Sequence, residues 1–275
     1  MKTKIKNKIR QFYLFVFLFM NVFPGHAQLE GYLTNRIKPG DIFYRDEGGQ
    51  EGFVDYRQWN QADPPGTALG VVFYSYYGTV PPETEGFEAG WHGWIVALDQ
   101  RDSCAWAPEG SVCNINCVAS YEVEGIYTPW NPMDEGVAYA LGDTCGWQNT
   151  KRILEFIYTG AGETLSEAVS PALYYIFSEK NGVTDFSQKP LMQGDSWYLM
   201  GYGQLRVLFG YFGFVNAALA SCGGTLFSLD AWYTSTEVSL DQKKGVWSYD
   251  GTGWMPNREN WFKKNPLSVR AVRNF

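Results

Sequence analysis

The chain has 275 residues and a formal net charge of −7, and aromatic residues make up 17% of it. An acidic surface is repelled by the phosphates of nucleic acids and by anionic lipid heads, which argues against both kinds of partner. The length is sufficient for a sizeable core, in one elaborate domain or two small ones.

The first 27 residues have the pattern of a signal peptide. Five cations precede an apolar stretch at residues 12–23, and Gly25-His26-Ala27 offers a small-residue cleavage site. The stretch is too short for a membrane span, although an uncleaved anchor is the alternative. Cleavage would leave 17 cations facing 29 acids, a net charge of −12. We therefore expect an exported protein, periplasmic, cell-surface or extracellular, whose mature chain does not insert into a membrane.

Short apolar runs predict strands in the part of the chain that follows. Residues 42–44 and 52–59 form the first two, separated by the Gly48-Gly49 turn. Residues 69–74 and 93–98 are continuous apolar runs, which are typical of strands buried on both faces.

Residues 99–146 lose this periodicity and hold four of the five cysteines. A connection of this length is usually functional or stapled, and cysteines in an exported chain favour disulfides. Three connectivities are open, and our working choice pairs Cys104 with Cys113 and Cys117 with Cys145. Zinc is not expected, because there is no Cys-x-x-Cys pair and only His92 remains after cleavage. We expect the fifth cysteine, Cys222, to be a buried small residue.

Helices are predicted next, followed by four more strands. Asn149 or Thr150 can cap a helix over residues 151–158, and Ser170-Pro171 can begin another at 172–180. Residues 204–221 have a helical pattern interrupted by two glycines, which favours two short helices joined by a turn. Strands are expected at residues 226–229, 232–238, 245–249 and 268–272. This order predicts an α+β fold with a short, mostly antiparallel sheet, two or three helices and long loops.

Several motifs, taken in order, resemble those of a known group. They are Gly40-Asp41-Ile42-Phe43-Tyr44, Trp197-Tyr198-Leu199, Val215-Asn216-Ala217-Ala218-Leu219, Gly223-Gly224, Thr234-Ser235-Thr236-Glu237 and Val269-Arg270-Ala271-Val272-Arg273-Asn274-Phe275.

This series is similar to the C-type-lectin-like modules of Bacteroidetes-type surface and fimbrillin-associated proteins, also called major-paralogue modules. The resemblance implies a single domain over residues 28–275 with a cysteine-rich insertion at about 99–146. Met200-Gly201 stands where those modules have Pro-Ser, and the calcium-dependent sugar motifs of true C-type lectins are absent. The resemblance therefore implies the scaffold but transfers no calcium or sugar site.

Candidate catalytic groups are few. His92 precedes a buried strand and is expected to be structural. Asp134-Glu135 beside Trp130 could serve a polysaccharide hydrolase, but adjacent carboxylates rarely face each other across a substrate. The hydroxyls at 234–236 are expected to make hydrogen bonds within the sheet, and Arg270 and Arg273 to pair with carboxylates such as Glu237. We therefore predict that the protein is not an enzyme.

Binding is the better prospect, because tryptophans lie in the turn-rich segments. Exposed Trp rings beside carboxylates suit carbohydrate or protein surfaces, although the same rings can instead fold inward. The candidate ligand-binding residues are Trp106, Trp130, Asp134, Glu135, Trp254 and Trp261.

No cofactor is expected. Asp241, Asp250 and Asn257 could contribute oxygen ligands to Ca²⁺, but no regular spacing supports a calcium site.

The sequence thus favours a secreted or surface-associated, non-catalytic adhesion module that recognises a glycan or a host or matrix protein. The alternative is a structural or accessory subunit of a fimbria-like assembly, whose partners would be other appendage subunits. A polysaccharide hydrolase is the second alternative.

Overall fold

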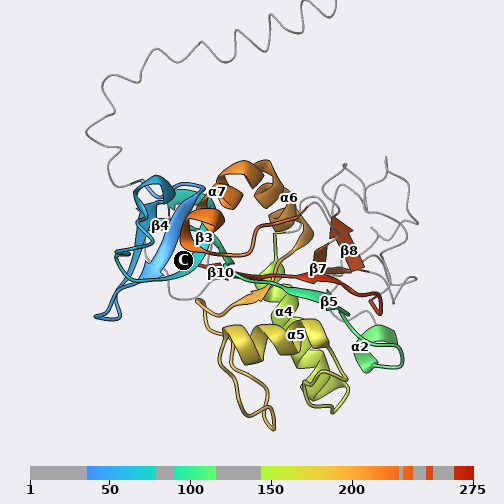
Figure 1. Ribbon diagram of the computed structural model, residues 1–275. Coiled ribbons are helices and arrows are strands. Elements are labelled where there is room, and N and C mark those ends of the chain that lie inside the picture. Colours follow the sequence, from blue (N-terminus) through green and yellow to red (C-terminus); the bar gives the residue numbers. More distant parts are fainter. Residues whose placement is uncertain (1–35, 79–89, 116–143, 229–231, 238–245, 250–262) are drawn as a thin grey trace, which may run out of the picture. The chain divides into compact units, whose positions relative to one another are not determined.

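The computed structural model describes residues 36–78, 90–115, 144–228, 232–237, 246–249 and 263–275 (Figure 1). The chain divides into two units, Met1–Arg36 and Ile37–Phe275. All strands and helices given below belong to the second unit.

The larger sheet is antiparallel and has six strands in the order β2-β1-β3-β4-β10-β6. Its members are β1 (Asp41–Arg45), β2 (Glu51–Asp55), β3 (Thr67–Gly78), β4 (Gly90–Ala97), β6 (Tyr198–Leu199) and β10 (Ala271–Asn274). Neighbouring residues of the inner strands point to opposite faces, so Val71 and Val96 enter one hydrophobic cluster while Val72 and Ile95 enter another. The expectation of strands buried on both faces is confirmed.

The smaller sheet has the order β5-β9-β7-β8, and its β7–β9 pair is parallel. Its members are β5 (Arg101–Cys104), β7 (Trp232–Glu237), β8 (Val246–Tyr249) and β9 (Leu267–Val269). Only Arg270 separates β9 from β10, so residues 267–274 contribute one strand to each sheet. This single residue is therefore the covalent link between the two sheets at that point.

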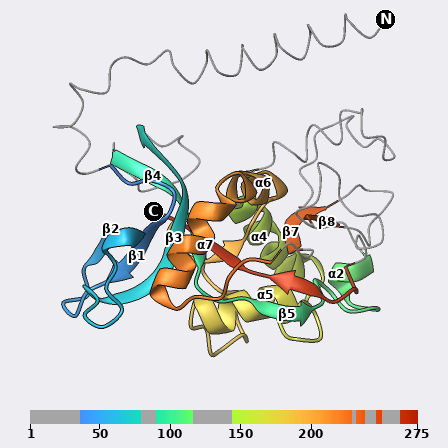
Figure 2. The same cartoon turned by 45° about the horizontal axis from the view of Figure 1, so that its top comes forward.

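The helices surround these sheets (Figures 1 and 2). They are α2 (Val112–Ile115), α4 (Gly146–Glu155), α5 (Pro171–Tyr175), α6 (Tyr202–Gly210) and α7 (Phe212–Cys222), with a 3₁₀ turn at Tyr56–Gln58. Both α4 and α5 continue into π-helical turns, at Phe156–Gly160 and Ile176–Lys180. Ser170 caps α5 as predicted, accepting a hydrogen bond from the Leu173 amide.

The predicted break in residues 204–221 is confirmed, since α6 ends at Gly210 and α7 begins at Phe212. Gly223 then ends α7 with a positive φ of 77°, a conformation that favours glycine. In the described part of the chain no helix alone has the length and apolarity to cross a membrane; α6 and α7 reach that length and composition only as a pair bent by 81°.

Among the described residues, three hydrophobic clusters hold these elements together. In the first, α6 and α7 cover one face of the larger sheet through Leu205, Val215 and Leu219. In the second, α4 and α5 pack against residues of both sheets through Ile153 and Leu173. The third lies on the opposite face of the larger sheet, where Phe43, Val72 and Ile95 are buried under a partial cover that includes Trp197 and Phe275.

Some local predictions were wrong. The aperiodic segment at 99–146 contains strand β5 and helix α2, and the helix expected at 151–158 already begins at Gly146. Residues 226–228 form no strand. The coarser prediction of an α+β fold with a mostly antiparallel sheet is confirmed.

Candidate functional site

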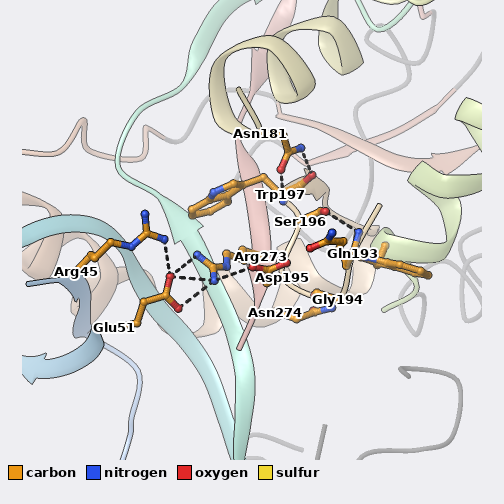
Figure 3. Close-up of polar contacts among 11 residues, drawn as sticks. Arg45, Glu51, Asn181, Gln193, Gly194, Asp195, Ser196, Trp197, Arg273 and Asn274 are labelled. Carbon is orange, nitrogen blue, oxygen red and sulfur yellow. Dashed lines mark hydrogen bonds and ion pairs between the residues drawn. The ribbon is translucent and has the colours of Figure 1, made fainter. Parts of the chain in front are cut away.

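A connected polar cluster on the larger sheet surrounds Arg273 of β10 (Figure 3). The Arg273 guanidinium donates to both Glu51 carboxylate oxygens, with N–O distances of 3.1–3.2 Å. It also lies 3.5 Å from an Asp195 oxygen and 5.1 Å from the centre of the Phe43 ring. Arg45 donates to the same Glu51 carboxylate at 2.8 Å. The predicted type of partner is confirmed for Arg273, although the carboxylates are Glu51 and Asp195.

The charges within this cluster balance one another. Burial alone would raise the pKa of Glu51, but the hydrogen bonds and charges of Arg45 and Arg273 outweigh it and lower that pKa. Two cations face two carboxylates, so the cluster has no net charge to offer a ligand. The ion pairs join β2, β10 and the segment before β6, and we call this cluster the charged clamp.

That segment, residues 193–197, is held from both sides (Figure 3). The Asn181 side chain donates to the Trp197 carbonyl and accepts from the Trp197 amide, both at 2.8 Å. The Gln193 amide donates to the Ser196 hydroxyl at 2.8 Å. The Trp197 ring closes over the sheet, where a Cβ added at Gly70 would lie 3.3 Å from it. A fixed aromatic cover thus lies beside the charged clamp.

Arg270 has a different environment from the one predicted. It is fully buried and donates to the carbonyls of Leu98 and Asp99, at 3.0 and 3.1 Å, and to that of Thr225. Its guanidinium carbon lies 4.2 Å from the centre of the Phe227 ring and 5.9 Å from that of Trp232. Burial lowers the pKa of Arg270 to about 10, so it remains charged at neutral pH. No carboxylate accepts a hydrogen bond from this arginine within the described residues, so the prediction of such a partner was wrong here.

The hydroxyls of β7 are also buried and hydrogen-bonded. Thr236 accepts from the Tyr202 amide at 2.9 Å and so caps α6, while Ser235 accepts from the Asn149 side chain at 3.2 Å. Their placement agrees with the structural role expected for residues 234–236. His92 is 6% exposed, and its ring lies 5.7 Å from that of Tyr76.

Of the predicted ligand-binding residues, the structure describes Trp106. This ring is fully buried, donates its indole N–H to the Thr234 carbonyl at 3.1 Å and lies 4.4 Å from the Lys263 ammonium. Trp106 therefore presents no ring to a ligand and takes the inward-folded alternative. The others lie outside the described residues: Trp130, Asp134, Glu135, Trp254 and Trp261.

The cysteines give a similar correction. Cys104 and Cys222 carry thiols in the structure, so the bond chosen between Cys104 and Cys113 is not formed there. Burial raises the pKa of Cys104 to about 12. Cys117 lies outside the described residues, and with it the bond chosen to Cys145. Cys222 is only partly buried.

No metal site is assigned. The described ranges hold no group of three or more His, Cys, Asp or Glu side chains that could bind an ion. The calcium candidates Asp241, Asp250 and Asn257 lie outside these ranges.

Sequence reasoning missed the aromatic residues at the outer end of the β3–β4 pair. We call this set the aromatic ribbon: Tyr74, Tyr76, Tyr77, Trp91, His92 and Trp94. Its signal in the sequence is the dense run of rings at 73–77 and 91–94. The strands were predicted to end at residue 74 and to begin at residue 93, because tyrosine, serine and histidine interrupt the apolar pattern.

Comparison with known proteins shows that the fold of this chain is similar to that of a solved structure. No protein-family model matches the chain, and no curated protein matches it. A solved structure of a fimbrial protein from Bacteroides ovatus ATCC 8483 is similar, with a TM-score of 0.53 and 15% sequence identity. The likeness covers 87% of this chain and 49% of that one, so the chain spans about half the length of this neighbour.

Proposed function

We propose that the protein is an exported structural or accessory subunit of a fimbria-like surface assembly. The observation that carries the proposal is the likeness to a fimbrial protein over 87% of this chain. The pattern of residues 1–27 supports export, which an assembly outside the cytoplasm needs. Its partners would be other subunits of the same appendage, and it would have no catalytic role.

Within the α+β class, we propose a C-type-lectin-like arrangement. The motifs that carry this resemblance form one connected part of the structure. Trp197-Tyr198-Leu199 contains β6, which pairs with β10 near the chain's end. Asn216 of α7 fixes the following turn by accepting from the Phe227 amide and donating to the Phe227 carbonyl. An experimental structure in which β6 and β10 are not paired would contradict this arrangement.

The test of the assembly role is the location of the protein in its own organism. A tagged chain should appear at the cell surface and co-purify with sheared surface filaments, and immunogold labelling should mark those filaments. A matched tagged protein that is exported but not part of the appendage controls for carry-over. Recovery of the chain only as soluble protein, with unlabelled filaments, would contradict the proposal.

A second candidate function is an adhesion module for a glycan or a host or matrix protein. The specific observation in its favour is the aromatic ribbon, where Tyr77 is 70% exposed. The polysaccharide hydrolase, based on Asp134 and Glu135, stays a prediction, because both residues lie outside the described ranges.

A further inference from the structure

The aromatic ribbon extends past the strands that flank it. On one side β1 pairs with β3 up to Val71, and on the other β10 pairs with β4 from Val96 to Trp94, while the terminal Phe275 pairs with Gly93. The remaining pairs, from Tyr76–His92 to Gly78–Gly90, join β3 and β4 alone within the described part of the chain. Figure 2 shows the β3–β4 pair extending beyond its neighbours. The end of this ribbon is therefore a projecting feature anchored in the sheet.

Rings on one face of the ribbon fix it to the core. Trp94 stacks on Tyr74 at 4.6 Å with an angle of 29° between the rings, and Tyr74 lies 5.9 Å from Tyr76. Trp94 also lies 5.8 Å from Phe73, a fully buried core residue. A continuous row of aromatic contacts thus leads from the core to the ribbon, which favours a fixed surface rather than an adaptable one.

The other face of the ribbon presents a corner. Tyr77 and Trp91 are direct partners across the strands, and their rings lie 5.6 Å apart at 68°. Tyr77 is 70% exposed and Trp91 is half-buried. Two rings that meet at a steep angle offer one aromatic wall and an adjoining edge, with the hydroxyl of the exposed Tyr77 as a hydrogen-bonding group.

Charge decides what kind of ligand this corner fits. Neither Thr67–Gly78 nor Gly90–Ala97 contains an Asp, Glu, Lys or Arg residue, although the whole chain carries 29 acids and 22 Lys and Arg residues. The segment 79–89 that joins these strands adds three glutamates to the sequence but no Lys or Arg. An anionic ligand would therefore lose solvation without meeting a cation from residues 67–97. An uncharged ligand with apolar faces and many hydroxyls matches the ribbon, because rings can cover the faces while the polar ring edges bind the hydroxyls.

We propose that the Tyr77–Trp91 corner is a binding site for a neutral saccharide, with a pyranose face packed against an aromatic ring. The site goes beyond the proposed assembly role and does not depend on it, since a subunit of an appendage or a separate protein could carry it. The glycan contacts would then lie on strands β3 and β4, and not on the loop tryptophans that the sequence predicted.

The test is isothermal titration of the full chain, purified after export, with three neutral oligosaccharides: maltohexaose, cellohexaose and mannohexaose. An oligogalacturonate of similar length is the charged probe. We expect saturable binding of at least one neutral probe and none of the charged one. Tyr77→Ala and Trp91→Ala should each weaken binding about tenfold, since an aromatic anchor typically contributes more than 1 kcal/mol.

The matched control is Phe214→Ala on α7, because Phe214 is 55% exposed and lies outside the ribbon. It should leave the affinity unchanged, and circular dichroism should show that all three variants fold. The proposal is overturned if no neutral probe binds, if the charged probe binds equally, or if Phe214→Ala weakens binding as much as Tyr77→Ala.

Sedimentation velocity gives a separate outcome. If Tyr77→Ala dissociates an oligomer and no neutral probe binds the parent protein, the corner is a contact between protein chains and the saccharide proposal is wrong. This result leaves the fold-based assembly proposal standing. Filament co-purification without saccharide binding would likewise separate the two proposals.

Discussion

The smaller sheet and the aromatic ribbon use similar side chains with opposite exposure. Around the smaller sheet, Trp106 and Trp232 are fully buried and Arg270 is enclosed with them. At the ribbon, Tyr77 is 70% exposed although it lies within a regular strand pair. The exposure of a side chain therefore follows from what covers its element, and not from whether the residue lies in a loop or a strand.

Covering elements explain both cases. The loop that holds Trp106 is fixed by hydrogen bonds to Thr234 of β7 and from Ser170 before α5, so the ring packs between distant segments. The ribbon extends past β1 and β10, and so its last rings lack flanking strands in the described part of the chain. Variants in the two regions should therefore differ in their effect on stability.

The largest effect is expected from Trp106→Ala. Loss of a fully buried indole should lower the free energy of unfolding by about 3–5 kcal/mol, measured by urea denaturation. Trp106→Phe is the matched control: it keeps most of the ring volume but removes the donor to the Thr234 carbonyl, so it should cost about 1–2 kcal/mol. Equal, small losses for both variants would contradict the contrast with the ribbon, since they would mean that the Trp106 ring is not part of the core.

Arg270→Met should follow, with a loss of about 3 kcal/mol. The substitution keeps an unbranched apolar chain between Phe227 and Trp232 but leaves the carbonyls of Leu98, Asp99 and Thr225 without the arginine donors. Urea denaturation again gives the measurement. Arg273→Met, three residues along the strand, is the control and should cost about 1 kcal/mol, because its partners Glu51 and Asp195 can turn to water. Similar losses at both positions would contradict the contrast between the two arginines.

Local chemistry made parts of this fold predictable from the sequence. Ser170-Pro171 marks a helix start through its hydroxyl cap, and Gly223 marks a helix end through its left-handed backbone. The apolar run around Val71 and Val72 indicates a strand with two buried faces. In each case the physical cause lies within a few residues of the position it determines.

Distant partners account for what could not be predicted. β5 has the polar sequence Arg-Asp-Ser-Cys and becomes a strand only by pairing with β9, more than 160 residues later. Arg273 finds Glu51 at a separation of 222 residues, and no local pattern distinguishes it from Arg270. The aromatic ribbon was missed for a related reason, because its exposure depends on where β1 and β10 stop.

A smaller effect is expected from Glu51→Gln, and it should depend on pH. The pKa of Glu51 is lowered in the folded protein, so its ionised form stabilises the fold at pH values above about 4.5, its usual pKa. That contribution is lost as the pH falls through the folded-state pKa, when the carboxylate becomes protonated. Urea denaturation should show a loss of roughly 0.5–1 kcal/mol for Glu51→Gln at pH 7 that shrinks below pH 4.5.

Glu47→Gln is the control for this pH effect. Glu47 lies in the turn that joins β1 to β2, and its side chain makes no hydrogen bond or ion pair with any described residue. This variant should lose less stability than Glu51→Gln at pH 7, because no described cation loses a partner. A pH-independent loss for Glu51→Gln would mean that Glu51 contributes to stability through packing rather than through its paired charge.

The smallest effect is expected from Tyr77→Ala, about 0.5 kcal/mol or less in the free energy of unfolding, because an exposed ring makes few contacts in the folded state. Tyr74→Ala is the matched change on the other face of the ribbon and should cost about 2 kcal/mol or more, since Tyr74 stacks on Trp94 next to the core. Urea denaturation of both variants compares the two faces within one strand.

A small loss for Tyr77→Ala together with weakened saccharide binding would separate the roles of the two faces, one for stability and one for recognition. If Tyr77→Ala instead costs as much as Tyr74→Ala, the corner supports the fold itself, and the contrast between the ribbon and the smaller sheet no longer holds.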